Sequence, residues 1–120
     1  MLKKRNRLKN NSAFRATYRN RSSVSDKSIV LYIGQEKSDK NCPTRVGFVV
    51  SKKIHKRAVV RNKIKRLMRE NVRHIICENA LPDKFQSLIF MARDNILDKD
   101  YSQIKCIINN LINKMANKNI

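Results

Sequence analysis

The segment from Ser51 to Glu78 constrains the fold more than any other part of the chain, because its pattern fits only an amphipathic helix. Its apolar residues recur at the spacing of an α-helix, about 100° per residue, and fall on one side: Val60, Ile64, Leu67, Met68, Val72 and Ile75. The opposite side is basic and polar: Asn62, Lys63, Lys65, Arg66, Arg69 and Arg73. The segment therefore predicts a helix that packs its apolar side onto a core.

The basic side of this helix lacks compensating charge. Between Lys52 and Arg73 the only acidic residue is Glu70, so few ion pairs at i,i+4 spacing can offset the repulsion. Polyanion binding is one interpretation, and a solvated basic face without a partner is the other. The net charge of +19 suits nucleic acid or an anionic membrane surface better than a neutral substrate. Clustered arginine favours nucleic acid, because the planar guanidinium matches phosphate.

Length and composition indicate one domain and a reducing compartment. The 120 residues suffice for a modest single core. No run of about 18 apolar residues predicts a membrane-spanning helix, and the basic start MLKKRNRLKNN lacks the apolar stretch of a secretory signal. Cys42, Cys77 and Cys106 form no CxxC pair, which is typical of free thiols in the cytosol. We therefore expect a cytoplasmic protein that does not bind a membrane.

The amino-terminal region predicts a basic arm followed by a short helix. Residues 1–11 are mostly basic and polar and lead into a segment that Asn11 or Ser12 can cap. Phe14 and Tyr18 stand at i,i+4 spacing on one side of that helix. Two interpretations of this aromatic pair stay open at this point. The pair either packs into the core or stacks on unpaired bases, for which the neighbouring arginines would be suitable.

Three apolar stretches predict strands. Ile29–Ile33 alternates, with Val30 and Tyr32 on one face, and Arg45–Ser51 is a second strand. The short charged loop between them predicts an antiparallel hairpin, while the polar segment 21–27 predicts a turn. Gln86–Ala92 is apolar nearly throughout, which is typical of a central strand covered on both faces.

The last helix carries a clean apolar stripe: Ile104, Ile107, Ile108, Leu111, Ile112 and Met115. Asp100 and Gln103 are placed as a capping box at its start. The element order is then helix, strand, strand, helix, strand, helix, which predicts an α+β single domain built as a small α/β sandwich. The strand, basic helix, strand segment is a crossover, and the default hand for a crossover is right.

The sequence offers no convincing active site. Asp94, Asp98 and Asp100 are the only clustered carboxylates, and helix capping explains them more simply than a magnesium site. His55 stands among lysines without a partner carboxylate, which favours a phosphate contact over a general base. We interpret the chain as a binding protein. A structural RNA-binding protein, such as a basic ribosomal protein, and a protein-only nuclease are the alternatives.

The sequence resembles a known family, the bacterial ribonuclease P protein subunit. SKKIHKRAVVRNKIKRLMRE, residues 51–70, is similar to the family signature, in which a strand ending in Lys-Lys leads into an RN(R/K)xKRxxRE helix. RLKNNSAFRATYRN, SIVLYI and LIFMAR resemble further family segments in the same order. Lys63 departs from the usual third arginine of an Arg-Asn-Arg triplet, which keeps the charge but loses bidentate geometry.

The resemblance implies a function for the whole chain as one RNA-binding domain, residues 1–120, whose arm at 1–11 is flexible without RNA. Ribonuclease P removes the 5′ leader from precursor tRNA, and in bacteria the catalytic RNA subunit performs the hydrolysis with bound magnesium. The protein subunit binds that RNA and the single-stranded leader, which broadens the substrate range. The implied partners are therefore the catalytic RNA and the leader of precursor tRNA, with no obligate protein partner. The family fold also implies a left-handed βαβ crossover, against the default hand.

The resemblance also assigns residues to two RNA surfaces. The leader site it implies consists of Phe14, Tyr18, Val30 and Tyr32. The catalytic-RNA site it implies consists of Lys52, Lys53, Arg61, Asn62, Lys63, Lys65, Arg66 and Arg69. It implies no catalytic residue and no metal ligand in the chain itself.

Overall fold

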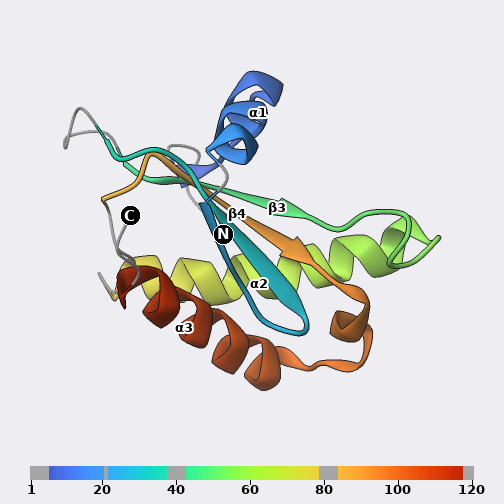
Figure 1. Ribbon diagram of the computed structural model, residues 1–120. Helices are drawn as coiled ribbons and strands as arrows, with labels where there is room; N and C mark the ends of the chain where they lie inside the picture. The colour runs from blue at the N-terminus through green and yellow to red at the C-terminus, as the bar shows by residue number, and fades with distance from the viewer. Residues whose placement is uncertain (1–5, 21, 38–42, 79–83, 118–120) are drawn as a thin grey trace.

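The computed structural model describes residues 6–20, 22–37, 43–78 and 84–117, and they form one α+β domain (Figure 1). The elements in chain order are α1 (Asn11–Arg19), β1 (Ser22–Ser25), β2 (Ile29–Ile33), β3 (Arg45–Val49), α2 (Ala58–Cys77), β4 (Ser87–Ala92), the short 3₁₀ helix η2 (Asp94–Asp98) and α3 (Tyr101–Asn117). The predicted fold class is confirmed, and the structure adds β1 and η2 to the predicted elements.

The strand order in the sheet is β1-β2-β4-β3. Strand β4 pairs antiparallel with β2 and parallel with β3, so that Ile89 stands between Tyr32 and Gly47. The predicted hairpin between Ile29–Ile33 and Arg45–Ser51 is therefore wrong, because β4 separates the two strands. The apolar run of β4 agrees with its central place, since every residue of the strand is buried except the half-buried Met91. The parallel pairing of β3 and β4 confirms the crossover through α2, and its left hand stays a prediction.

Strand β1 was expected to be a turn. Ser22–Ser25 pairs antiparallel with β2 at the edge of the sheet. Its serines have little strand propensity, but the backbone of β2 offers an unpaired edge, and Val24 packs against the core. The amide of Asp26 donates to the carbonyl of Ile29 at 2.8 Å and closes the turn between the two strands. This segment is thus a strand because it pairs with β2, although its local composition predicts a turn.

The hydrophobic core lies between the sheet and the helices α2 and α3, which cover the same face of the sheet (Figure 1). The predicted apolar stripe of α2 is confirmed: Ile64, Met68, Val72 and Ile75 are buried, and Val60 and Leu67 pack against the core. The stripe of α3 is confirmed in the same way, with Ile107 partly buried and its other members buried. Helix α1 lies alone on the opposite face of the sheet (Figure 1).

The capping residues at the helix ends agree in part with those predicted from the sequence. The side chain of Asn10, and not of Asn11 or Ser12, caps α1 by accepting the amide of Ser12 at 2.8 Å. The capping box of α3 is confirmed, because the Asp100 carboxylate accepts the amide of Gln103 at 2.9 Å and the Gln103 side chain accepts the amide of Asp100 at 3.0 Å. Capping thus accounts for Asp100, as expected.

Part of the predicted basic arm is packed on the sheet. Residues 6–10 run along β3, where the amide of Leu8 donates to the carbonyl of Val46 at 2.9 Å. Asn6 and Leu8 are buried. Residues 1–5, Pro82 in the predicted connector and Cys42 lie outside the described residues. The flexibility of the arm without RNA stays a prediction. Cys77 and Cys106 are free thiols, as expected.

Candidate nucleic-acid interface

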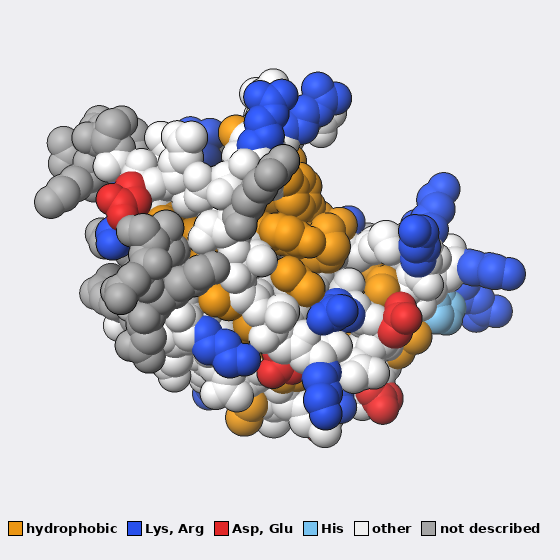
Figure 2. All heavy atoms as spheres, in the orientation of Figure 1, with side chains coloured by type: hydrophobic (Ala, Val, Ile, Leu, Met, Phe, Trp, Pro, Cys, Tyr) orange, Lys and Arg blue, Asp and Glu red, His pale blue; other side chains and the backbone are white. Residues whose placement is uncertain are grey.

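The face of the sheet opposite α2 and α3 is only partly covered, and we call it the open sheet face. Strand register places Val30, Met91 and Val49 in one row across it and Tyr32, Ile89 and Gly47 in the next row. Figure 2 shows hydrophobic side chains gathered beneath α1, with lysine and arginine side chains to either side. The open sheet face therefore presents apolar surface where a folded domain usually presents polar side chains.

All four residues predicted for the leader site come together on this face. Phe14 and Tyr18 project from α1, and Val30 and Tyr32 project from β2 on the side away from the core. Each of the four is half-buried. Sequence reasoning missed Val49 and Met91, which complete the row next to Val30. The alternation along their strands would have placed both residues on a face, but the wrong hairpin put β3 next to β2.

Helix α1 is fixed to the sheet by close contacts. The Phe14 ring lies directly on Gly47, where an added Cβ atom would stand only 2.6 Å from Cζ of the ring and 2.7 Å from Cε1. The hydroxyl groups of Thr17 and Ser87 share a buried hydrogen bond, and the side-chain amide of Asn20 donates to the carbonyl of Ile33 at 3.0 Å. Glycine at position 47 is thus required for the close approach of Phe14 rather than for a turn.

Tyr18 and Tyr32 form an aromatic pair between α1 and β2. Their ring centroids are 4.9 Å apart and the rings meet edge to face at 80°, a favourable geometry for two aromatic rings. Burial raises the pKa of Tyr18 above its ordinary value of 10.0, and the neighbouring Tyr32 raises the same pKa further. Both causes favour the neutral phenol over the phenolate at this place on the face.

The predicted catalytic-RNA residues occupy α2 and the loop before it. Asn62, Lys63 and Arg66 are exposed on the outside of the helix, and Lys52 and Lys53 are exposed in the loop. In the described part of the chain, no ion pair engages Lys63, Lys65, Arg66 or Arg69. These charges are available to an external anion, which agrees with the interpretation of a polyanion-binding face.

Arg61 differs from the other basic residues of this set. Its guanidinium donates to the carbonyl of His55 at 3.0 Å and to the carbonyl of Lys56 at 2.9 Å. The amide of Arg57 donates to Nδ1 of His55 at 3.1 Å in the same loop. Arg61 thus holds the loop against the start of α2, and part of its donor capacity is used within the protein.

Arg73 is also set apart, because its charge is compensated. Its Nε and a terminal nitrogen both donate to one carboxylate oxygen of Glu70, at 2.9 and 2.8 Å. The hydrogen bond from Arg73 lowers the pKa of Glu70, and the same bond raises the pKa of Arg73. Sequence spacing alone placed Arg73 with the other cations, but the ion pair leaves it less charge for an external phosphate.

The two surfaces meet at a hollow of about 260 Å³ beside α1. Gly47 lines it from β3, Phe14 lines it from α1, and Lys65 and Arg69 line it from α2. Arg7 and Lys9 of the amino-terminal segment complete it. The structure thus divides the predicted basic set, because Lys65 and Arg69 line this hollow together with Phe14, while Asn62, Lys63 and Arg66 are exposed on the outside of α2.

The described residues give no sign of a metal centre or a membrane segment. Within the four ranges that the structure covers, no three His, Cys, Asp or Glu side chains are grouped so that they could hold a metal ion. Over the same ranges no helix has the length and apolar character needed to span a membrane.

These features define a class of protein, a small α+β domain that presents an open apolar sheet face beside a basic helix. Comparison with known proteins then specifies the family. Residues 2–116 match the family model described as ribonuclease P. A ribonuclease P protein component from Clostridium botulinum strain Langeland is 39% identical over 111 residues, which cover 92% of this chain and 95% of that protein. One from Alkaliphilus oremlandii is 37% identical over 92% of this chain and 90% of that protein.

Solved structures agree with the sequence comparison. The ribonuclease P protein of Staphylococcus aureus is similar with a TM-score of 0.74 and 31% identity, over 93% of this chain and 95% of that chain. The Thermotoga maritima protein has the same fold, with a TM-score of 0.76 over 90% of this chain and 96% of that chain, at 23% identity. The chain therefore belongs to the ribonuclease P protein family, whose members are components of a tRNA-processing nuclease.

Proposed function

We propose that this chain binds the catalytic RNA of ribonuclease P through α2 and holds the single-stranded 5′ leader of precursor tRNA on the open sheet face. One observation carries the proposal: the molecule presents an aromatic apolar face and a basic helix as two adjoining surfaces of different chemistry. A structural RNA-binding protein needs the basic surface alone. The aromatic face therefore favours a protein that also handles unpaired bases.

The chemistry of each surface matches a different form of RNA. Unpaired bases stack on aromatic rings whatever their sequence, and Phe14, Tyr18 and Tyr32 offer such rings. Folded RNA offers mainly phosphates, which lysine and arginine bind without reading sequence. For this surface we propose Lys52, Lys53, Arg61, Asn62, Lys63, Lys65, Arg66 and Arg69, with Arg61 acting partly through the loop that it holds.

In this proposal the chain supplies binding and positioning, and hydrolysis takes place on the RNA. Magnesium ions bound to the RNA and the substrate supply the Lewis-acid chemistry of phosphodiester hydrolysis. Of the clustered carboxylates, Asp100 accepts the amide of Gln103 in the cap of α3, and Asp98 lies 4.0 Å from the Lys99 amine. The protein's cations instead reduce the repulsion between the two RNA molecules, which lowers the magnesium concentration required for binding.

Cleavage of precursor tRNA at low magnesium tests this function. The cognate catalytic RNA is assayed with and without this protein, beside the protein alone. We expect the protein to stimulate cleavage only when the RNA is present. Cleavage by the protein alone would reveal an active site in the chain, and an absence of stimulation would favour a structural RNA-binding role. Both results would contradict the proposal.

A further inference from the structure

The outside of α2 begins with an apolar side chain. Val59 lies in the first turn of the helix and is 79% exposed. It is not part of the hydrophobic core, against which its neighbour Val60 packs. Among the described residues, the one other exposed large hydrophobic side chain is Leu97 of η2, at 46%. Val59 therefore leaves most of its apolar surface in water.

Val59 lies in one row with polar and basic side chains that we assign to the catalytic RNA. Residues at i, i+3, i+4 and i+7 share one side of an α-helix. Counted from Val59, the last three of these positions hold Asn62, Lys63 and Arg66. All three are exposed, as Val59 is. A ligand on this side of α2 would therefore meet an apolar side chain at the start of the row and cations further along it.

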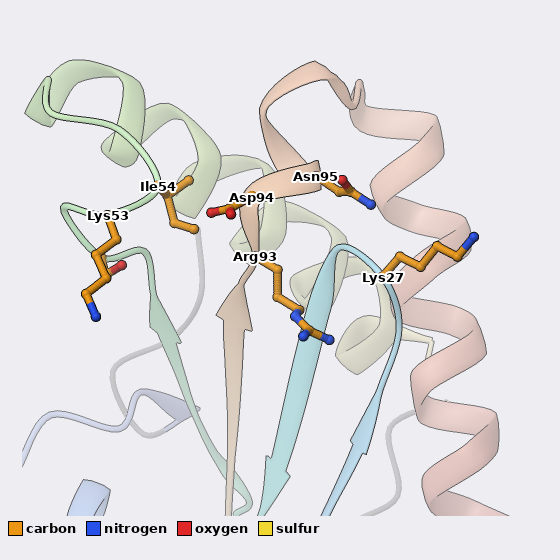
Figure 3. Close-up of a pocket in the computed structure, with 7 residues that line it drawn as sticks. Lys27, Lys53, Ile54, Arg93, Asp94 and Asn95 are labelled. Carbon is orange, nitrogen blue, oxygen red and sulfur yellow. The ribbon is translucent and has the colours of Figure 1, made fainter.

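The backbone that carries Val59 is held in place. The Arg61 guanidinium donates to the carbonyl groups of His55 and Lys56, which ties the preceding loop to the first turns of α2. The same loop packs against the core through Ile54, which Figure 3 shows pointing from the loop toward the end of β4. Because valine is β-branched, its side chain has little rotational freedom in a helix. Val59 thus offers a rigid apolar contact beside long, flexible charged side chains.

The fold gives no reason for a valine at position 59. β-branched residues are weaker helix formers than alanine, lysine or arginine, so an exposed valine does not help the helix. A single exposed apolar side chain is common on protein surfaces, and Leu97, which precedes Asp98 in η2, is such a case. Val59 differs from Leu97 because it adjoins the basic surface of α2.

The charge around Val59 restricts the partner that can cover it. Exposed cations precede it at Lys56 and Arg57 and follow it at Lys63 and Arg66. A second copy of the chain would bring the same cations against these, because a two-fold interface pairs a surface with itself. RNA carries the opposite charge. Within RNA, unpaired bases offer apolar faces, whereas a duplex presents mainly phosphates and 2′-hydroxyl groups.

We propose that Val59 packs against the face of an unpaired base in the catalytic RNA, next to the phosphates that Lys63 and Arg66 bind. This inference rests on the proposed function, and it adds an apolar contact to a surface assigned only to polar and charged residues. Lysine and arginine contacts to phosphate carry no sequence information, whereas a base must be unpaired and correctly placed to reach Val59. Val59 thereby helps to fix the position of α2 on the catalytic RNA.

Binding of the cognate catalytic RNA by the full-length protein across a salt series tests this contact. Val59→Ala should weaken binding by roughly tenfold at every salt concentration, the effect of removing about two methyl groups from an apolar contact. The slope of log affinity against log salt should stay as in wild type, because no phosphate contact is lost. Val59→Ile keeps the apolar contact and should bind as wild type does. Leu97→Ala, which removes an exposed apolar side chain outside α2, is the matched control and should leave the affinity unchanged.

Two further measurements separate an RNA contact from a folding effect. Val59→Ala should leave the free energy of unfolding unchanged or slightly higher, because alanine is the better helix former. A fall in stability would assign Val59 to the fold and overturn the inference. Base-specific chemical probing of the catalytic RNA at saturating protein should reveal an unpaired base that wild type protects and Val59→Ala leaves reactive. Lys63→Ala should keep that base protected.

The outcomes distinguish failure of the inference from failure of the proposed function. If wild-type protein binds the catalytic RNA and Val59→Ala binds it equally well, the inference is wrong and the proposed function stands. A lower salt slope in Val59→Ala, or lost affinity without any base becoming reactive, would also overturn the inference, since Val59 would then not cover a base. If wild-type protein does not bind the catalytic RNA, the proposed function fails and the inference fails with it.

Discussion

The open sheet face and the outer side of α2 are both exposed, but they are built in opposite ways. The open sheet face is apolar at its centre, and its geometry is fixed by strand register and by the contact of Phe14 with Gly47. The outer side of α2 carries charges on long side chains, with one compensated cation, Arg73. A rigid apolar face can select a shape, whereas mobile charges bind any nearby phosphate. The difference predicts that the two surfaces respond separately to mutation.

The largest expected effect comes from Gly47→Ala. The new Cβ atom would lie 2.6 Å from the Phe14 ring, so α1 must shift away from the sheet. Overpacking of this kind costs about 1–3 kcal/mol. Thermal or denaturant unfolding measures the loss of stability. Leader binding should fall with it, while catalytic-RNA binding through α2 should change little.

A second substitution checks the cause of that loss. In the background of Gly47→Ala, Phe14→Leu removes the ring that meets the new Cβ atom. Because the two sites are in direct contact, Phe14→Leu should lower the free energy of unfolding less in this background than in wild type. Additive losses in this double-mutant cycle would mean that Gly47 acts through something other than Phe14.

Of the two RNA-binding activities, removal of the ring itself should affect only leader binding. Phe14→Ala should weaken the binding of leader-bearing precursor by about 1–3 kcal/mol, the usual contribution of one stacked base. Affinity for the catalytic RNA alone should be preserved. Phe14→Leu is the control, because it retains apolar volume against Gly47 but loses the aromatic plane. Full leader affinity in Phe14→Leu would show that Phe14 packs rather than stacks.

On α2 the expected effect is smaller and depends on salt. Arg66→Ala should weaken catalytic-RNA binding and lower the slope of log affinity against log salt by about 0.9, because one phosphate contact is lost. Arg73→Ala is the matched control on the same helix, since Glu70 already compensates Arg73. We expect a distinctly smaller change in that slope for Arg73→Ala. Equal slopes for the two variants would show that the helix acts through total charge and not through particular residues.

The sequence could predict those parts of the fold that depend on local periodicity. The stripe of α2 and the stripe of α3 are periodic over several turns, so their buried residues followed directly from spacing. Strand β1 was missed, since its serines pair only because β2 offers an edge. The order of the strands was missed for a similar reason. Pairing of β4 between β2 and β3 depends on contacts between distant segments, which local pattern does not contain.

In the candidate site, too, the residues that follow a local pattern were predicted and those that depend on distant contacts were not. Spacing and family resemblance placed Phe14, Tyr18, Val30 and Tyr32 together, and the structure brings them onto one face. Glycine 47 had no signal in the sequence, because its role is to leave room for a ring that is 33 positions away in the chain. The compensation of Arg73 was within reach of the sequence, since Glu70 stands at i−3 on the same helix.

The smallest expected effect concerns pH and the neutral character of the open sheet face. Burial, with a further contribution from Tyr32, raises the pKa of Tyr18 above 10.0 in the folded state. A raised folded-state pKa means that the unfolded chain loses the Tyr18 proton first, so this contribution to stability is complete below pH 10.0 and is lost as the pH rises through the folded-state pKa. The free energy of unfolding should therefore fall more steeply above that pH in wild type than in Tyr18→Phe. Denaturant unfolding across the alkaline range measures both slopes, and the two proteins differ only at position 18. Parallel slopes would mean that Tyr18 is as well hydrated in the folded state as in the unfolded chain, which would contradict a face that excludes water between α1 and β2.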